Sequence, residues 1–141
     1  MPGVTLTVSG QADPALTTRL ARELAELTCR VLRKELARTT VWVRYHPADQ
    51  WFIAGRALAD LGKNAFRLEV TITDETNTKA EKAAYQREAF ALLSRLISDV
   101  HPHSNVHVID CRASAYGYGG ITQEEYGLRS SAAPIDRSDA A

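Results

Sequence analysis

Hydrophobic and polar residues alternate in four segments of the chain, at positions 4–8, 39–45, 66–73 and 106–109. A period of two is typical of a β-strand, because successive side chains point to opposite faces of the sheet. One face of each segment is hydrophobic and the other is mixed, with threonine, arginine, glutamate or histidine among its residues. The pattern therefore predicts four strands.

Two other segments have the spacing of amphipathic helices. Before the first, Asp13 can cap the helix and Pro14 suits its first position. The second follows Thr78, which forms a possible capping box with Glu81. The expected apolar stripes are Leu16, Leu20, Leu24, Leu27 and Val31 in the first helix, and Ala83, Phe90, Leu93, Ile97 and Val100 in the second.

The order of strand, helix and strand occurs twice. Val41-Trp42-Val43 recurs 65 positions later as Val106-His107-Val108, and Val4 and Leu6 match Leu68 and Val70 at an offset of 64. Such a repeat predicts two copies of one supersecondary unit. Within each unit, a helix that joins two strands favours a right-handed parallel crossover.

These units predict an α/β (α+β) fold with a four-stranded mixed sheet and both helices on one face. The tandem β-α-β units would cover about residues 2–62 and 64–122 of a single domain, residues 1–126. Residues 127–141 are rich in Ser, Ala and Asp without periodicity, so we expect a flexible tail or arm there. The other face of the sheet should be covered by further subunits, because it is mixed but ordered; its predicted residues are Thr5, Thr7, Trp42, Arg44, Glu69, Thr71, His107 and Ile109.

Each unit ends in an aromatic and glycine-containing segment. Trp51-Phe52-Ile53-Ala54-Gly55 is too short for a core helix and predicts a hairpin or a pocket lid. Tyr116-Gly117-Tyr118-Gly119-Gly120 predicts a tight hairpin beside a site, because no clear helix opens after it as a phosphate-binding loop requires.

Composition excludes several classes of partner. The 141 residues include 17 basic and 17 acidic side chains, so no basic field indicates nucleic acid or a membrane surface. Cys29 and Cys111 do not make a disulfide framework, and no hydrophobic run is long enough to span a bilayer. We expect a cytoplasmic, soluble protein. His101, His103 and His107 lack a carboxylate or cysteine at the spacing of a metal site, so we expect no metal.

Pro2 is the first candidate for chemistry. The small side chain of Pro2 permits removal of Met1, which would leave a secondary amine at the chain terminus. An exposed terminal amine has a pKa of about 7.7–8.0, and burial or a nearby cation would lower that pKa and keep the amine neutral. Alternatively, the proline only starts a strand, where its missing N–H does no harm.

Together, these features resemble the tautomerase superfamily, of which 4-oxalocrotonate tautomerase is the type member. The resemblance covers about residues 2–125 and rests on Pro2, Ser9-Gly10, Thr40-Val41-Trp42-Val43 and the two aromatic-glycine segments. It implies that Pro2 is the catalytic base, that the chain forms a homotrimer, and that the reaction is proton transfer on a 2-oxo or 2-hydroxy-dienoic acid. It also implies that no cofactor takes part.

The chain departs from the family at the residues that bind the substrate carboxylate. Gln11 and Trp42 stand where the family has arginines, His107 takes the equivalent place in the second unit, and Tyr118 replaces a phenylalanine. A small carboxylic acid still requires a cation and an apolar wall. The candidate substrate-binding residues are Arg44, Trp42, Tyr118, His107, Arg67 and Phe52, with Arg112 a further cation.

Two other functions remain open at this point. A Pro2 that stays protonated would act as an acid, and the protein would then hydrate or dehalogenate an unsaturated acid or decarboxylate a 3-oxo acid. Alternatively, the protein is a non-catalytic trimeric binding protein that has kept the fold and lost the arginines.

Overall fold

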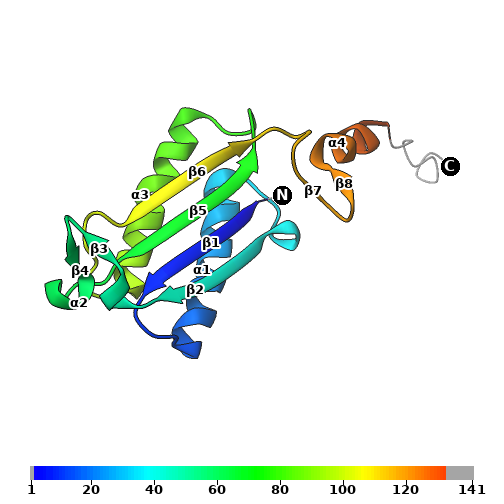
Figure 1. Ribbon diagram of the computed structural model, residues 1–141. Coiled ribbons are helices and arrows are strands. Elements are labelled where there is room, and N and C mark those ends of the chain that lie inside the picture. The colour runs from blue at the N-terminus through cyan, green and yellow to red at the C-terminus, as the bar shows by residue number, and fades with distance from the viewer. Residues whose placement is uncertain (1, 133–141) are drawn as a thin grey trace.

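A four-stranded mixed sheet forms the centre of the computed structural model, which describes residues 2–132 (Figure 1). Strands β1 (Gly3–Ser9) and β2 (Thr40–His46) are parallel, as are β5 (Phe66–Thr73) and β6 (Asn105–Cys111). The two pairs meet where β1 runs antiparallel to β5, which gives the order β2-β1-β5-β6. The predicted strands and mixed sheet are confirmed.

Helices α1 (Pro14–Leu32) and α3 (Lys79–Leu96) pack side by side on one face of the sheet, as expected (Figure 1). Asp13 Oδ1 accepts the Leu16 N–H at 3.2 Å, and the capping box at Thr78 is present. No helix among residues 2–132 is long and apolar enough to cross a membrane. Short helices complete the connections: η1 (Leu36–Arg38), η2 (Ala48–Gln50) and α2 (Leu58–Leu61).

The predicted stripe of the second helix is wrong at its two ends. Ala83 is exposed, and Val100 lies beyond the helix, where it forms a bridge with Asn64. The helix ends earlier because Ile97, its C-cap, already has an extended backbone. The buried side chains of α3 are Tyr85, Ala89, Leu92 and Leu93.

Both aromatic-glycine segments form hairpins. Strands β3 (Phe52–Ile53) and β4 (Arg56–Ala57) pair at one end of the sheet, and β7 (Gly117–Tyr118) and β8 (Ile121–Thr122) pair at the other. A Cβ on Gly117 would overlap the carbonyl of Ile121, so only glycine fits there. These segments are hairpins, as predicted.

The second hairpin leads directly into a helix. The sequence predicts wrongly that no clear helix opens after this segment and that an aperiodic tail begins at residue 127. Helix α4 (Gln123–Ala132) begins before the predicted tail and includes residues 127–132, and with β7 and β8 it projects from the sheet (Figure 1). Residues 133–141 of the predicted tail lie outside the described part of the chain. The helix was missed because Gly127 and the serines after it are poor helix formers.

The core lies between the sheet and the two helices. Its fully buried side chains include Val4, Leu6, Leu20, Leu24, Phe66, Leu68, Val70, Tyr85 and Leu93. The opposite face of the sheet, which we call the open face, carries the eight residues predicted for it, and all of them are half-buried or exposed. Trp42 and Ile109 on this face remain 56% and 41% exposed, so hydrophobic side chains face away from the core.

A buried hydrogen bond between the helices gives the first testable prediction. The hydroxyls of Thr28 and Tyr85 lie 2.8 Å apart, and both residues are fully buried. Tyr85→Phe leaves the Thr28 hydroxyl without this partner and should lower the free energy of unfolding by about 1–3 kcal/mol. Adding Thr28→Val should restore part of that loss, which urea unfolding of both single variants and the double variant will measure.

The pH dependence of the free energy of unfolding distinguishes the effect of the Tyr85 hydroxyl from that of side-chain packing. Burial raises the pKa of Tyr85, against a smaller opposing effect of the Thr28 hydrogen bond. The neutral phenol therefore stabilises the fold fully below the unfolded pKa of about 10 and progressively less as pH rises above that value. Between about pH 9 and 11, the free energy of unfolding should fall less in Tyr85→Phe than in the wild type. An equal fall in both proteins would show that ionisation of Tyr85 is not the cause.

Candidate active site

Pro2 is buried at the start of β1 and lines a small cleft. Its carbonyl oxygen accepts the Thr40 N–H at 3.3 Å, which fixes the backbone beside β2. The cleft has a volume of about 170 Å³. We call it the Pro2 cleft, and its lining residues are Pro2, Arg33, Lys34, Glu35 and Arg38. Three cations and one carboxylate therefore surround the proline.

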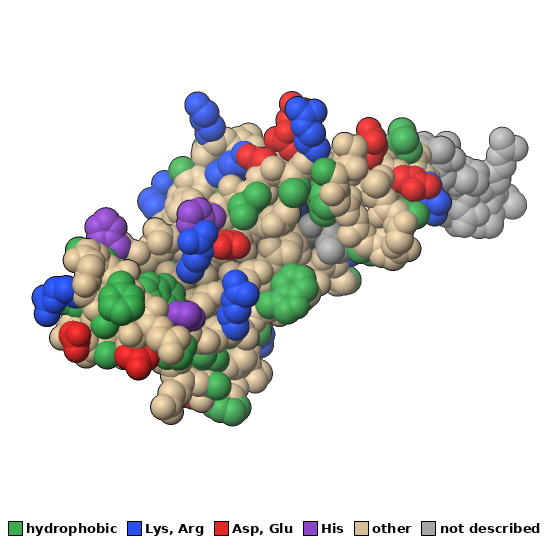
Figure 2. All heavy atoms as spheres, in the orientation of Figure 1, with side chains coloured by type: hydrophobic (Ala, Val, Ile, Leu, Met, Phe, Trp, Pro, Cys, Tyr) green, Lys and Arg blue, Asp and Glu red, His purple; other side chains and the backbone are tan. Residues whose placement is uncertain are grey.

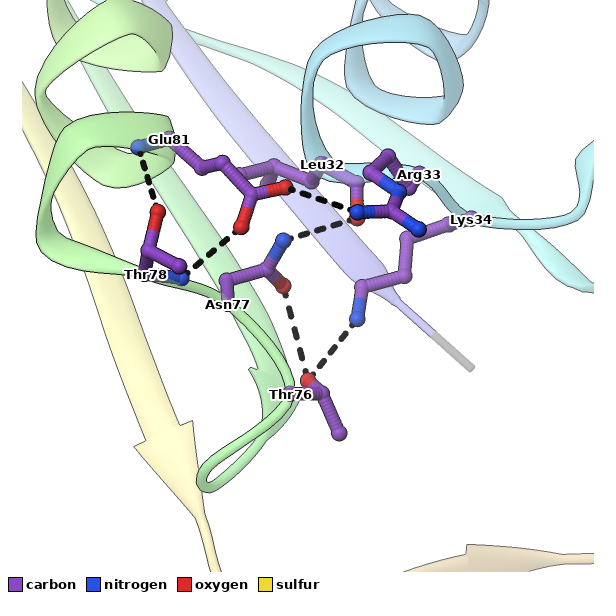
Figure 3. A network of polar contacts seen from close by, with 7 residues as sticks. All are labelled: Leu32, Arg33, Lys34, Thr76, Asn77, Thr78 and Glu81. Carbon is purple, nitrogen blue, oxygen red and sulfur yellow. Dashed lines mark hydrogen bonds and ion pairs between the residues drawn. The ribbon is translucent and has the colours of Figure 1, made fainter.

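Lys34 is placed by the way α1 ends. Arg33 has a φ of 57°, in the left-handed region, and the Lys34 N–H donates to the Cys29 carbonyl at 3.0 Å. This turn directs the Lys34 side chain towards the loop between β5 and α3, where its Nζ donates to Thr76 Oγ1 at 2.9 Å (Figure 3). The first unit thus supplies the cation and the second unit holds it.

The loop that holds Lys34 is itself anchored. The Thr76 hydroxyl donates to the Thr73 carbonyl at 2.6 Å, which leaves its oxygen free to accept from Lys34. Asn77 Nδ2 donates to the Leu32 carbonyl at 2.9 Å, and this bond ties the loop to the end of α1 (Figure 3). Glu81, in the capping box, lies 3.9 Å from Arg33. Within residues 2–132, Thr76 is the only hydrogen-bond partner of the Lys34 ammonium group, so two of its N–H donors remain to bind an anion.

Burial and nearby charges act on the pKa of the amines in this cleft. Burial lowers the pKa of Lys34, and the attraction of Glu81 opposes this only in part. The same surroundings, with Arg33 and Arg38 added, would lower the pKa of an amine at Pro2. The cleft therefore offers cationic partners to a carboxylate. For a terminal amine at Pro2, burial and these cations would disfavour the protonated form, whereas Glu35 would favour it.

Two predicted aromatic residues lie at this end of the sheet. The Tyr118 ring lies 6.0 Å from the Arg38 guanidinium and stacks on Tyr126, with centroids 4.2 Å apart. The Trp42 ring lies against Gly3, the neighbour of Pro2. Arg38 also forms an ion pair of 3.1 Å with Glu35. Tyr118 and Trp42 thus border the Pro2 cleft without lining it.

Three other candidates gather elsewhere within the chain. Arg44, Arg67 and Phe52 line a hollow of about 490 Å³ at the other end of β1, with Thr7, His46 and Trp51 among its further lining residues. We call this hollow the distal pocket. His107 is exposed on β6 opposite Glu69, and Arg112 is exposed beyond the end of that strand. None of these five residues lines the Pro2 cleft.

Lys34, Arg33 and Arg38 were not predicted from the sequence. Arg33 and Lys34 follow the end of α1 and Arg38 is the last residue of η1, and basic residues at such places commonly interact with the helix C-terminus or with water. The sequence did offer one signal: basic residues are concentrated at positions 33–38, directly before β2, the strand that pairs in parallel with β1. Among residues 2–132 no cluster of His, Cys, Asp and Glu could hold a metal ion, and His101 and His103 only place their rings 5.8 Å apart.

Comparison with known proteins gives likeness in structure but not in sequence. No protein-family model matches the chain, and no curated protein matches it. A symmetric trimer of a wild-type fused 4-OT shares 18% identity and a TM-score of 0.75, over 89% of this chain and 98% of that chain. Pt0534 inactivated by 2-oxo-3-pentynoate shares 14% identity and a TM-score of 0.77, over 87% and 98%.

A third solved structure widens the comparison. The macrophage migration inhibitory factor-like protein from Entamoeba histolytica shares 12% identity and a TM-score of 0.67, over 86% of this chain and 97% of that one. These chains have nearly the same extent as residues 2–132 but little sequence in common. What they share with this chain is the arrangement of helices and strands.

Proposed function

We propose that this chain, which has the 4-oxalocrotonate tautomerase fold, is a cofactor-independent tautomerase that uses the nitrogen of Pro2 as a general base. The observation that carries the proposal is one cleft that joins Pro2 to Lys34 and two arginines. The substrate class is a small 2-oxo or 2-hydroxy-dienoic acid, because the cations suit a carboxylate.

The proposed reaction needs no group from outside the cleft and the substrate. After removal of Met1, the neutral amine takes a proton from the carbon next to the carbonyl of a 2-oxo acid, or from the hydroxyl of a 2-hydroxy-dienoic acid. The electron pair of the broken bond remains on the substrate as a dienolate, with the negative charge on oxygen. Lys34 binds the carboxylate and, with Arg33 and Arg38, stabilises the negative charge. The protonated amine then returns the proton to another carbon or to the oxygen, which completes the isomerisation.

We also propose that the protein is a homotrimer in which the open face packs against other subunits. Its support is the exposed hydrophobic surface on this face and the likeness to trimeric fused 4-OT structures. Ile109→Glu should shift the trimer towards smaller species, because the carboxylate would be buried unpaired. Leu36→Glu, at an exposed hydrophobic residue of η1, is the matched control in sedimentation experiments. A trimer that withstands Ile109→Glu would contradict this interface.

One observation favours the second candidate function. Glu35 places a carboxylate in the Pro2 cleft, where it could favour a protonated amine or position a water molecule. A protonated Pro2 would act as an acid in hydration, dehalogenation or decarboxylation. The ion pair between Glu35 and Arg38 works against this alternative, because it partly neutralises the carboxylate.

Labelling with 2-oxo-3-pentynoate tests the proposed base. The amine would add to the alkyne, forming an N–C bond while one π bond breaks and the neighbouring carbon takes up a proton. We expect the intact mass of one reagent on the amino-terminal peptide, together with loss of phenylenolpyruvate turnover. Turnover that persists after full labelling of Pro2 would overturn the proposal. Label only on Cys29 or Cys111 would equally count against it.

A further inference from the structure

We propose that the distal pocket is a second binding site, separate from the Pro2 cleft, for a small aromatic or unsaturated carboxylate. The pocket has a volume of about 490 Å³, within the usual range for small-molecule sites. Arg44 and Arg67 face it from neighbouring parts of the open face, since Arg44 pairs with Thr7 and Thr7 pairs with Arg67.

The pocket lies far from Pro2 along the sheet. Gly3, which follows Pro2, pairs with Thr40, whereas Arg44 pairs with Thr7. Four strand residues separate these positions, about 13 Å at the usual rise per residue. The hairpin of β3 and β4 covers the distal end, and the β7–β8 hairpin projects from the opposite end (Figure 1).

Both arginines are held by Nε alone. Arg44 Nε donates to Thr7 Oγ1 at 2.9 Å, and Arg67 Nε donates to Glu69 Oε1 at 2.6 Å. Within residues 2–132 no hydrogen bond or ion pair occupies the terminal nitrogens of either guanidinium. A guanidinium fixed in this way presents parallel N–H donors, which suit the two oxygens of a carboxylate.

The charge and the walls of the pocket define the ligand further. Among its described lining residues none is acidic, and Glu69, the ion-pair partner of Arg67, lies outside the lining. Trp51 and Phe52 supply the apolar wall, and Phe52 is 61% exposed. Figure 2 shows basic and histidine side chains beside hydrophobic ones at this end of the open face. A flat unsaturated body can stack on these rings while its carboxylate meets the arginines.

Among the described lining residues of the distal pocket none carries an amine or a thiol, and the inferred binding is reversible. The pocket shares Thr7 and Arg44 with the open face. A second site here therefore requires that subunit contact lies on the remainder of this face, which includes Trp42, Thr71 and Ile109, and leaves the distal end uncovered. Occupancy of the pocket and turnover at Pro2 are therefore separate properties of the chain, and each can be measured without the other.

Calorimetric titration with cinnamate tests this site. The titration uses the full-length Lys34→Met variant, which removes a cation from the Pro2 cleft. We expect one cinnamate per chain, with affinity at least about tenfold weaker after adding Arg44→Met or Arg67→Met. Arg56→Met is the matched control, because Arg56 is exposed on the β3–β4 hairpin that carries Phe52 and does not line the pocket. This substitution should change the affinity for cinnamate less than about twofold.

Two results would overturn the site. If Lys34→Met alone abolishes cinnamate binding, the carboxylate binds only in the Pro2 cleft. If Arg44→Met and Arg67→Met weaken binding no more than Arg56→Met, the arginines do not hold the ligand. Circular dichroism of all variants excludes unfolding as the cause. Because the readout is binding, failure here leaves the proposed tautomerase activity untouched.

Discussion

Pro2→Ala is expected to lower kcat/KM for phenylenolpyruvate by about 10²- to 10⁴-fold, the usual contribution of a positioned acid or base. The variant keeps an amine at the terminus, but it loses the rigid ring and the secondary amine that the Pro2 cleft holds in place. The loss should fall mainly on kcat, because Lys34 still binds the carboxylate.

Gly3→Ala is the control for this experiment. A Cβ at Gly3 would make only an ordinary contact, 3.6 Å from the Trp42 ring, and the terminal amine would be unchanged. Turnover in this variant should stay close to that of the wild type. If Pro2→Ala is as active as Gly3→Ala, the base is elsewhere and the proposed mechanism fails.

Lys34→Met is expected to lower kcat/KM by about 10- to 100-fold, mainly through a higher KM. The variant removes the ammonium group that Thr76 holds in the cleft, while methionine keeps a chain of similar length. Lys63→Met, at an exposed lysine outside the cleft, is the control for a general change of charge. An unchanged KM in Lys34→Met would show that the carboxylate binds at another cation.

The same lysine predicts a pH dependence. Because burial lowers the pKa of Lys34, the ammonium group loses its charge at a lower pH than an ordinary lysine, whose pKa is about 10.4. The KM of the wild type should therefore rise on the alkaline side before that pH is reached. Lys34→Met should show no such rise, and an alkaline rise of equal size in both proteins would assign it to another group.

Most of the fold could be predicted from the sequence because its signals are local. Alternation defined the four strands, Asp13 and Thr78 marked the starts of both helices, and the repeat indicated two equal units. The predicted end of α3 was wrong, because Val100 continues the helical spacing although the chain is already extended at Ile97. Tyr85, a large buried residue, was missed because a tyrosine among charged neighbours does not indicate a core position.

The site was harder to predict because it depends on how the two units pair. At the offset of 64, Phe66 is the residue equivalent to Pro2, and Arg67 follows it directly. The antiparallel pairing of β1 and β5 nevertheless places Arg67 at the other end of the sheet from Pro2. Alternation cannot distinguish parallel from antiparallel pairing of the units. Lys34 reaches the cleft only because Arg33 takes a left-handed conformation, which no residue type there indicated.

The most direct test of the central claim is the pKa of the Pro2 nitrogen in the folded protein, measured by NMR titration after labelling proline with ¹⁵N. A general base in this cleft predicts a nitrogen that titrates at or below about 7.7–8.0, the range of a free terminal amine. A pKa above about 9 would make Pro2 an acid and favour hydration or decarboxylation. A nitrogen that does not titrate, because Met1 is retained and Pro2 is an amide, would contradict the proposed role of Pro2 as the base.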